Sequence, residues 1–384
     1  MKAKIAIIDS VAARGGSHHF YLFGQSIGLI NTGFDVCLFT NDLTDNPKIK
    51  GLKIKNYYKG IFGRKFNLVA GIFYIYGSIR SIIGAKYFGA SICHFHLFHV
   101  NILVAFDLII CKIIGLKVVY TVHDVLSNLE KNQSSHKLIY FVLRYADKII
   151  THNEFSKQQM LVLFQKIGKD IAVIPHGNYL PFISISKSTD DSRSYLDIPK
   201  DKKVILFFGM IKKIKGLEIL LDSLSLVKRI HPNILLLIAG KAWENDFSVY
   251  QEIIDRQNLG DNCIIHNKYI PSEDVSYYFS ASDLLVLPYK RISQSGVLMM
   301  AMSYNIPVLT SDLPPFREVI VDKDNGFLFE TENKRSLADK IVTIFNDESV
   351  LSSVRKKAMD LIKLEYNWNK LGILTKAAYK SLRR

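Results

Sequence analysis

The chain has 384 residues, of which 48% are hydrophobic and 22% are charged, and its formal net charge is +15 at pH 7. A single hydrophobic core rarely grows to that length, so two domains are expected. The composition excludes a disordered chain, a collagen-like repeat and a small disulfide scaffold. The cysteines lie far apart without a CxxC pair, so we expect reduced core thiols in a cytosolic protein. They are Cys37, Cys93, Cys111 and Cys263.

The first apolar run predicts a strand rather than a targeting segment. Only Ile5–Ile8 stand between Lys4 and Asp9, which is too short for the apolar core of a signal peptide. Residues 87–106 carry no full charge but contain three histidines among other polar side chains. We therefore predict no membrane-spanning helix and a protein that is soluble or peripheral.

Short apolar runs alternate with amphipathic helical patterns along the whole chain. After Ile5–Ile8, the first series of predicted strands is Val36–Thr40, Ile92–Phe95, Val118–Val122, Lys148–Thr151 and Ile171–Ile174. The second series is Val204–Phe208, Ile234–Ala239, Cys263–His266, Leu284–Leu287, Val308–Thr310 and Phe327–Phe329. Continuous Val, Ile and Leu runs between such helices are typical of parallel sheets covered on both faces. The predicted fold class is α/β, with two doubly wound, Rossmann-like parallel-sheet domains facing a cleft.

Polarity and composition predict where the domains end. Residues 178–199 are rich in Ser and Asp and have no apolar period, which indicates a linker. The domains are then 1–177 and 200–365, and the tail 366–384 is predicted to form a helix that packs back toward the first domain. In this architecture ligands bind beyond the carboxyl ends of the strands, so the loops that follow strands are the candidates.

A basic segment lies within the predicted first domain. No acidic residue occurs between Asn46 and Phe106, whereas nine Lys and Arg residues, mixed with aromatic ones, lie within 48–86. Basic and aromatic side chains together favour an anionic membrane surface as partner, which predicts a peripheral protein on the inner face of the membrane. A solvated basic face is the alternative. No nucleic-acid-binding motif accompanies the charge, so nucleic acid is not the expected partner.

Two candidate loops follow strands of the first domain. Gly15 and Gly16 follow the first strand and open a helix, where backbone N–H groups can approach a phosphate or sugar. The loop lacks GxGxxG spacing, and a plain tight turn is the alternative. His123 and Asp124 end the fourth strand, where His123 is either a catalytic group facing the substrate or a core histidine. His94 and His96 alternate on the preceding strand and face one side. Without an HExxH motif or clustered carboxylates we expect no metal.

Two further loops belong to the second domain. Lys212 and Lys215 follow the strand that ends near Gly209, and lysines there can reach a diphosphate as point charges. A solvated basic loop is the alternative. Ser293, Gln294, Ser295 and Gly296 offer hydroxyls, an amide and an open backbone at a helix N-terminus, which suits a diphosphate. An N-cap would explain one serine alone.

In their order and spacing these loops resemble the motifs of the family 4 glycosyltransferases of the GT-B fold, over nearly the whole chain. In the first domain the similar segments are the Gly15-Gly16 loop, Thr-Val-His-Asp at 121–124 and Val-Ile-Pro-His-Gly at 173–177. In the second they are 205–216, 280–288, 300–308 and 311–326, which includes Glu318. The resemblance implies that Glu318 contributes to donor binding.

The chain departs from the family pattern at its paired glutamates, whose positions hold Ile292 and Met300. The family's arginine is Met210, while Lys215 remains and Lys212 can replace the lost charge. The Ser-Gln-Ser-Gly loop is similar to a subgroup with a T/S-Q-S-G donor loop in place of the glutamates. A non-catalytic sugar-nucleotide-binding subunit of a polysaccharide assembly complex stays open as the alternative. A dinucleotide-dependent oxidoreductase is disfavoured because GxGxxG is absent.

The resemblance implies a hexosyltransferase-like enzyme that retains anomeric configuration. A nucleotide-diphosphate sugar would bind the second domain, and a glycan or polyprenyl-linked acceptor the first. Lys212, Lys215 and the 293–296 loop would stabilise the leaving diphosphate, with neither metal nor cofactor. His123 would contact the donor sugar or the acceptor hydroxyl. The implied pathway is bacterial surface polysaccharide biosynthesis.

Overall fold

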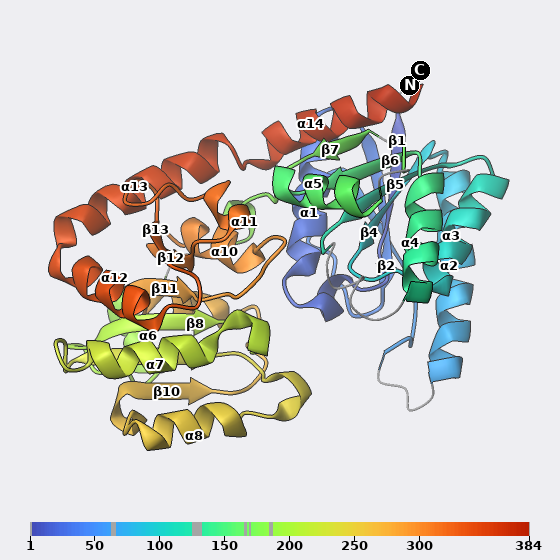
Figure 1. Cartoon of the computed structure of the whole chain (residues 1–384). Coiled ribbons are helices and arrows are strands. Elements are labelled where there is room, and N and C mark those ends of the chain that lie inside the picture. Colours follow the sequence, from blue (N-terminus) through green and yellow to red (C-terminus); the bar gives the residue numbers. More distant parts are fainter. Residues whose placement is uncertain are drawn as a thin grey trace. The chain divides into compact units, whose positions relative to one another are not determined.

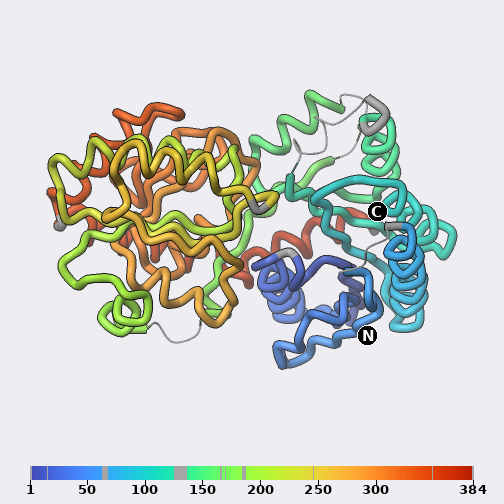
Figure 2. The backbone as a smooth tube through the Cα atoms, turned by 90° about the horizontal axis from the view of Figure 1, so that it is seen from below, coloured from blue at the N-terminus to red at the C-terminus, as the bar shows by residue number. Residues whose placement is uncertain are grey.

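The computed structural model describes residues 2–62, 67–124, 133–164, 167–168, 170–183 and 187–383. The chain forms two compact units (Figures 1 and 2). Unit 1 comprises Met1–Gly177 with Tyr366–Arg384, and unit 2 comprises Asn178–Glu365. The tail that the sequence predicted to return to the first domain belongs to unit 1.

Unit 1 contains a seven-stranded parallel sheet with the order β3-β2-β1-β4-β5-β6-β7. The strands are β1 (Lys4–Ile8), β2 (Asp35–Asn41), β3 (Leu52–Tyr58), β4 (Ile92–Leu97), β5 (Lys117–Val122), β6 (Lys148–Thr151) and β7 (Ile171–Val173). The helices are η1 (Ala12–Gly15), α1 (His18–Asn31), α2 (Asn67–Phe88), α3 (Ile102–Ile113), α4 (Gln133–Tyr145), α5 (Glu154–Leu163), α14 (Trp368–Lys380) and η6 (Ser381–Arg383). Side chains from α2, α3, α4 and α5 form one apolar core with the sheet, while α1 lies on the opposite side (Figure 1).

Unit 2 contains a six-stranded parallel sheet with the order β10-β9-β8-β11-β12-β13. The strands are β8 (Lys203–Phe208), β9 (Ile234–Ala239), β10 (Cys263–His266), β11 (Leu284–Leu287), β12 (Val308–Ser311) and β13 (Phe327–Phe329). The α-helices are α6 (Thr189–Tyr195), α7 (Leu217–Val227), α8 (Ser248–Arg256), α9 (Val275–Ser280), α10 (Gly296–Ser303), α11 (Pro314–Arg317), α12 (Lys334–Asn346) and α13 (Glu348–Leu364). The short 3-10 turns are η2 (Leu180–Phe182), η3 (Lys213–Lys215), η4 (Trp243–Asn245) and η5 (Gly260–Asn262). The prediction of two doubly wound parallel sheets is confirmed.

One strand was not predicted from the sequence, and one segment predicted to be a linker belongs to unit 2. The missed strand, β3, alternates exposed or half-exposed lysines with apolar residues, because it forms the edge of its sheet. The predicted linker 178–199 is instead part of unit 2 and contains α6. Arg193 of α6 is buried, and its Nη2 lies 2.9 Å from the carboxylate of Asp283. This ion pair fastens the segment to unit 2.

Helix α2 corrects the expectation that no stretch qualifies as a membrane span. In the part of the chain that the structure describes, Leu68–Phe88 is long and apolar enough for one, although 28% of its apolar window is buried. Its inner side packs on the sheet through two glycines. A Cβ at Gly77 would lie 2.6 Å from the Tyr58 ring, and one at Gly84 would lie 2.8 Å from the Phe39 ring. These contacts identify α2 as a covering helix of unit 1 with an exposed outer face.

All four cysteines are free thiols, as predicted. Cys37, Cys93 and Cys111 are buried, and Cys263 is half-buried. Burial raises the pKa of Cys37 to about 11 and that of Cys263 to about 12. Both thiols are therefore protonated and poorly reactive at neutral pH.

Candidate functional site

The two candidate loops of unit 2 and the segment that contains Glu318 follow neighbouring strands. Because β8, β11 and β12 are adjacent in a parallel sheet, the loops after them begin at the same edge. The first two loops are also joined directly, since the Lys290 N–H donates to the Ile214 carbonyl at 2.9 Å. Gly216 has a positive φ of 66°, and a Cβ there would lie 2.0 Å from the Pro288 carbonyl oxygen. Glycine is needed at 216 for both reasons.

Lys215 belongs to the first of these loops, and its side chain contacts the second. Its Nζ atom is 5.3 Å from the centre of the Tyr289 ring. Nζ is also within 3.4 Å of the position that a Cβ on Gly209 would take, and the same point is 3.5 Å from Val297. No carboxylate among the described residues pairs with Lys215. Burial lowers the pKa of Lys215 to about 8, so the side chain is a desolvated cation at neutral pH.

The Ser-Gln-Ser-Gly loop ends at the first turn of α10. The Leu298 N–H donates to the Ser295 hydroxyl at 3.2 Å, so Ser295 is the N-cap. Gly296 is the first helical residue and does not have a positive φ. Ser293 is buried, and the Oε1 atom of Gln294 is buried without a hydrogen-bond partner in the described part of the chain. A buried amide without a partner needs an explanation, and a ligand that donates to it is one.

The other predicted donor residues lie more toward the surface. Lys212 has its Nζ 4.3 Å from the centre of the Trp243 ring, a cation–π contact. Glu318 is exposed at the end of α11, in the loop after β12. At the positions of the paired glutamates, Met300 is buried in α10 and Ile292 is partly buried. Neither position provides a carboxylate.

In unit 1 the loop after β1 is organised by a buried carboxylate. Asp9 accepts hydrogen bonds from the N–H groups of Val11 at 2.8 Å and Ala12 at 2.6 Å. These bonds position the short turn η1, which Gly16 ends with a positive φ of 65°. A Cβ at Gly16 would meet no atom within 4 Å, so the side of the loop at Gly16 is open. The open backbone fits either a plain turn or a ligand.

His123 lies just beyond β5 and belongs to a chain of buried imidazoles. Its Nδ1 is 3.1 Å from His152 Nε2, and its Nε2 is 2.9 Å from His96 Nδ1. Burial lowers the pKa of His123 well below 6.5, so the ring is neutral at pH 7. Asp124, the next residue, is partly exposed. His123 is therefore both at a strand end and in the core, so the two interpretations of it are not exclusive.

Several residues of this cluster were missed from the sequence. His94 and His96 do share one side of β4, with ring centres 5.0 Å apart. His18, His152 and His176 also meet there, although each follows a different element. Adjacent parallel strands end at one edge, and that rule together with the strand order would have predicted part of the cluster.

A lysine with a lowered pKa and a helix N-terminus on adjoining loops form a site for an anion. The Gln294 amide oxygen is an acceptor and would instead bind a donor group of the ligand, such as a hydroxyl. Two glycines, at 216 and 240, let the loop backbones approach closely at this edge of unit 2, since a Cβ at each would lie 2.0 Å from a carbonyl oxygen, that of Pro288 and that of Gly209 respectively. The geometry suits a diphosphate, whose charge Lys215 and the α10 N–H groups can neutralise. The imidazoles of unit 1 offer neutral hydrogen-bonding groups.

Comparison with known proteins agrees with this geometry. Residues 20–178 match the family model Glycosyltransferase Family 4, and residues 188–366 match Glycosyl transferases group 1. YtcC of Bacillus subtilis (strain 168), a proposed glycosyltransferase, is 26% identical over 63% of this chain and 62% of its own. The capsular polysaccharide biosynthesis glycosyltransferase CapM of Staphylococcus aureus is 26% identical over 60% of this chain and 64% of its own. The chain thus spans about three fifths of the length of these curated relatives.

Solved structures share the fold over the full length. Sucrose-phosphate synthase of Thermosynechococcus elongatus superposes with a TM-score of 0.79 at 18% identity, covering 100% of this chain and 99% of its own. HepE of Anabaena, in complex with UDP and glucose, gives 0.75 at 17% identity, covering 99% and 100%. The two glycosyltransferase family models together cover most of the chain, one in each half. The chain therefore belongs to the family 4 glycosyltransferases of the GT-B fold.

Proposed function

We propose that this protein transfers a sugar, of the hexose class, from a nucleotide-diphosphate sugar to a glycan or polyprenyl-linked acceptor. The proposed pathway is bacterial surface polysaccharide biosynthesis. CapM, named for capsular polysaccharide biosynthesis, and HepE, which holds UDP and glucose, support the pathway and the donor class. The anionic group of the donor would be its diphosphate, bound to unit 2.

The observation that carries the proposal is the environment of Lys215. A desolvated ammonium without a carboxylate partner is costly unless an anion completes the site. The diphosphate gains negative charge as the glycosidic bond breaks, so a fixed cation stabilises the transition state more than the bound donor. Backbone N–H groups at Gly296 and the N-terminal turn of α10 add further donors to the leaving group. Lys212 and Glu318 would lie at the outer part of this site.

The acceptor and the donor sugar would meet the residues at the edge of the unit 1 sheet. His123 and Asp124 would contact the sugar or the acceptor hydroxyl, and Gly15 and Gly16 would bring backbone N–H groups to it. Retention of anomeric configuration is part of the proposal. The diphosphate step uses lysine and helix dipole in place of a metal or cofactor.

A lipid-linked acceptor would require the enzyme to reach the cytoplasmic membrane surface. The outer face of α2 carries exposed apolar side chains at helical spacing, which we call the α2 face: Leu68, Ile72, Tyr76, Ile79, Ile83 and Tyr87. Arg80 and Lys86 add positive charge on the same helix, and Lys53 and Lys55 lie on the neighbouring strand β3. Arg64 and Lys65, two of the nine basic residues within 48–86, lie outside the described residues. An apolar stripe with basic flanks favours the anionic inner leaflet as partner.

A panel of nucleotides tests the donor proposal. A ligand that binds only the folded protein stabilises it by about 2.7 kcal/mol at a hundredfold excess over Kd. We expect one of UDP-, GDP- or dTDP-sugars to raise the melting temperature of the wild type, and Lys215→Met to lose most of that rise. Lys213→Met, at an exposed lysine two residues away, is the matched control. Equal stabilisation of all three proteins would contradict a diphosphate site at Lys215.

A non-catalytic sugar-nucleotide-binding subunit is the second candidate. The uncharged side chains of Ile292 and Met300 favour it, since both carboxylate positions of the family are lost. This subunit would show the thermal shift without consuming the donor. Release of nucleoside diphosphate by the wild type therefore separates the two candidates.

A further inference from the structure

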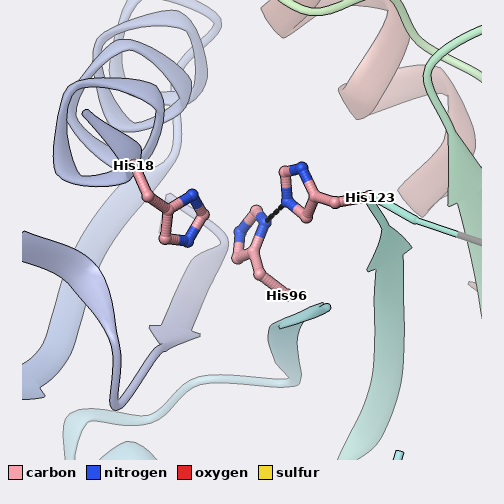
Figure 3. A group of neighbouring side chains, drawn as sticks. All are labelled: His18, His96 and His123. Carbon is pink, nitrogen blue, oxygen red and sulfur yellow. Dashed lines mark hydrogen bonds between the residues drawn. The ribbon is translucent and has the colours of Figure 1, made fainter. Parts of the chain in front are cut away.

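Three histidines from separate elements of unit 1 converge on one point (Figure 3). His18 begins α1, His96 lies on β4, and His123 follows β5. One ring nitrogen from each lies within 4.8 Å of the other two. His18 and His123 are buried, and His96 is partly exposed, which leaves one side open to small solutes.

A carboxylate fixes the position of the proton on the His18 ring. His18 Nε2 lies 2.9 Å from Asp9 Oδ2. Carboxylate oxygens accept hydrogen bonds, so Nε2 must carry the hydrogen. In the neutral ring, His18 Nδ1 then holds a lone pair. Figure 3 shows the His18 ring turned toward the other two histidines.

The proton of His123 is assigned through a second ring. His152 Nδ1 lies 3.0 Å from the Ile174 carbonyl oxygen, which can only accept, so His152 carries its hydrogen on Nδ1. His152 Nε2 is then an acceptor, and His123 Nδ1 must donate to it across 3.1 Å. In neutral His123 the lone pair is therefore on Nε2, the atom that faces His96.

The position of the proton on the His96 ring is fixed by the Gln25 amide. Its Nε2 lies 3.0 Å from Gln25 Oε1, an acceptor, so the hydrogen is on Nε2 and the lone pair is on Nδ1. His96 Nδ1 and His123 Nε2 are 2.9 Å apart. Two lone pairs then face each other without a hydrogen between them. Such a contact is repulsive unless a cation lies beside it.

A proton and a metal ion are the two candidate cations. A proton would require a charged ring packed against other imidazoles, since His94 lies beside His96 and His152 beside His123. A metal ion would use both lone pairs, because neutral imidazole is the form that binds a metal.

We infer that His18, His96 and His123 form a site for a divalent transition-metal ion, with Zn²⁺ as the best-suited ion. Three neutral imidazoles are a ligand set that zinc accepts, with a fourth position left for water or a solute. Each ring also has the second partner that metal-bound histidines usually have: Asp9, Gln25 and His152. This inference departs from the sequence-based expectation of no metal and is independent of the proposed diphosphate chemistry.

A reversed Gln25 amide is the competing arrangement. It would donate to His96 Nε2, move the hydrogen of His96 to Nδ1 and turn the close pair into an ordinary hydrogen bond to His123. The cluster would then offer fewer than three lone pairs and bind no metal. Metal titration decides between the two arrangements.

The test uses the full-length protein without a histidine tag. Isothermal titration with zinc chloride at pH 7 should give one site per chain, and bound Co²⁺ should give the intense visible absorption of a four-coordinate ion. His18→Gln and His96→Gln should each weaken zinc binding at least tenfold. Asp9→Asn should do so by 10- to 100-fold, because an amide can donate to His18 Nε2 and so moves the lone pair away from the site.

His266→Gln, in unit 2, is the matched control and should bind zinc like the wild type. Far-ultraviolet circular dichroism verifies that each variant is folded. If a histidine variant fails to fold, X-ray absorption of the zinc-loaded wild type replaces it and should show about three imidazoles at about 2.0–2.1 Å. Absence of stoichiometric zinc binding by the wild type, or equal loss in His266→Gln, overturns the inference.

Discussion

At the residue scale, the proposed donor site predicts that donor affinity depends on the charge of Lys215. Burial lowers its pKa to about 8, so the free protein loses this charge as pH rises through 8. A diphosphate prefers the protonated lysine, and affinity should therefore fall by up to tenfold per pH unit above 8. Calorimetric titration of the nucleoside diphosphate from pH 7 to 9.5 measures this. Lys215→Met should bind 10- to 100-fold more weakly at pH 7 and show a flat profile; an unchanged slope would assign the titration to another group.

Gly296 and Ser295 separate ligand binding from helix capping. Gly296 is helical, so Gly296→Val should fold yet place a side chain where the diphosphate approaches the backbone, and nucleotide affinity should fall at least tenfold. Ser295→Ala removes the N-cap and should lower the free energy of unfolding by about 1 kcal/mol, with a smaller loss of affinity. Calorimetry and urea denaturation distinguish these effects. Wild-type affinity in Gly296→Val would leave the loop as a helix cap only.

The candidate site residues that the sequence could single out are those that follow a strand along the chain. Lys215 and Gly296 are such residues, and their role in donor binding stays a prediction. The inferred histidine site could not be predicted, because His18 and His123 are brought together by strand order. The protonation of His123 depends further on the carbonyl of Ile174, a contact without any sequence signal.

At the element scale, helices α1 and α14 touch through their backbones. A Cβ at Gly28 would lie 2.2 Å from the Trp368 carbonyl oxygen, and one at Gly372 would lie 2.2 Å from that of Gly28. Gly28→Ala should therefore separate the helices and lower the free energy of unfolding by about 2 kcal/mol or more. Gly71→Ala, in α2 with no atom within 4 Å, is the matched control and should stabilise by about 0.5–1 kcal/mol. Equal effects in urea denaturation would contradict the close crossing.

The α2 face makes a separate prediction about lipid. Ile72 is 60% exposed, so Ile72→Glu should cost little stability but put a negative charge on the α2 face. Sedimentation with vesicles of anionic and neutral lipid should show salt-sensitive binding of the wild type to the anionic ones, reduced several-fold in the variant. Val249→Glu on α8, where Val249 is 57% exposed, should bind like the wild type. Equal recovery with both vesicle types would remove the membrane proposal.

Most elements could be predicted because their apolar runs are continuous. Strands such as β9 and β11 have the predicted bounds, since buried parallel strands are apolar on both faces. The edge strand β3 was not predicted, because Lys53 and Lys55 interrupt its run of apolar residues. Helix α6 was not predicted, because its residues are polar and Arg193 pairs with Asp283, a residue far away in the sequence.

At the scale of the whole molecule, the two units should differ in acid stability. Nine of the eleven histidines lie in residues 1–177. Burial lowers the pKa of His94 to about 3 and that of His152 to about 4. The unfolded chain binds protons near pH 6.5 and the folded unit 1 does not, so unit 1 loses stability as pH falls below 6.5. The loss is about 1.4 kcal/mol per pH unit for each such histidine.

Each unit contains one tryptophan, which makes this prediction measurable. Trp368 is buried in unit 1 and Trp243 is exposed in unit 2. In Trp243→Phe the emission of Trp368 should shift to the red between pH 6 and 4, while part of the helical circular dichroism remains. If Trp368 emission stays that of a buried side chain down to pH 4, the predicted loss of unit 1 stability at acid pH is wrong.

The central claim is that this chain consumes a nucleotide-diphosphate sugar, and release of nucleoside diphosphate measures it most directly. Purified wild type is incubated with UDP-, GDP- and dTDP-sugars, and the released diphosphate is quantified by ³¹P nuclear magnetic resonance. The account predicts release from one donor class, reduced 10- to 100-fold in Lys215→Met and unchanged in Lys213→Met. Binding of a donor without any release, or equal release by Lys215→Met, would contradict it.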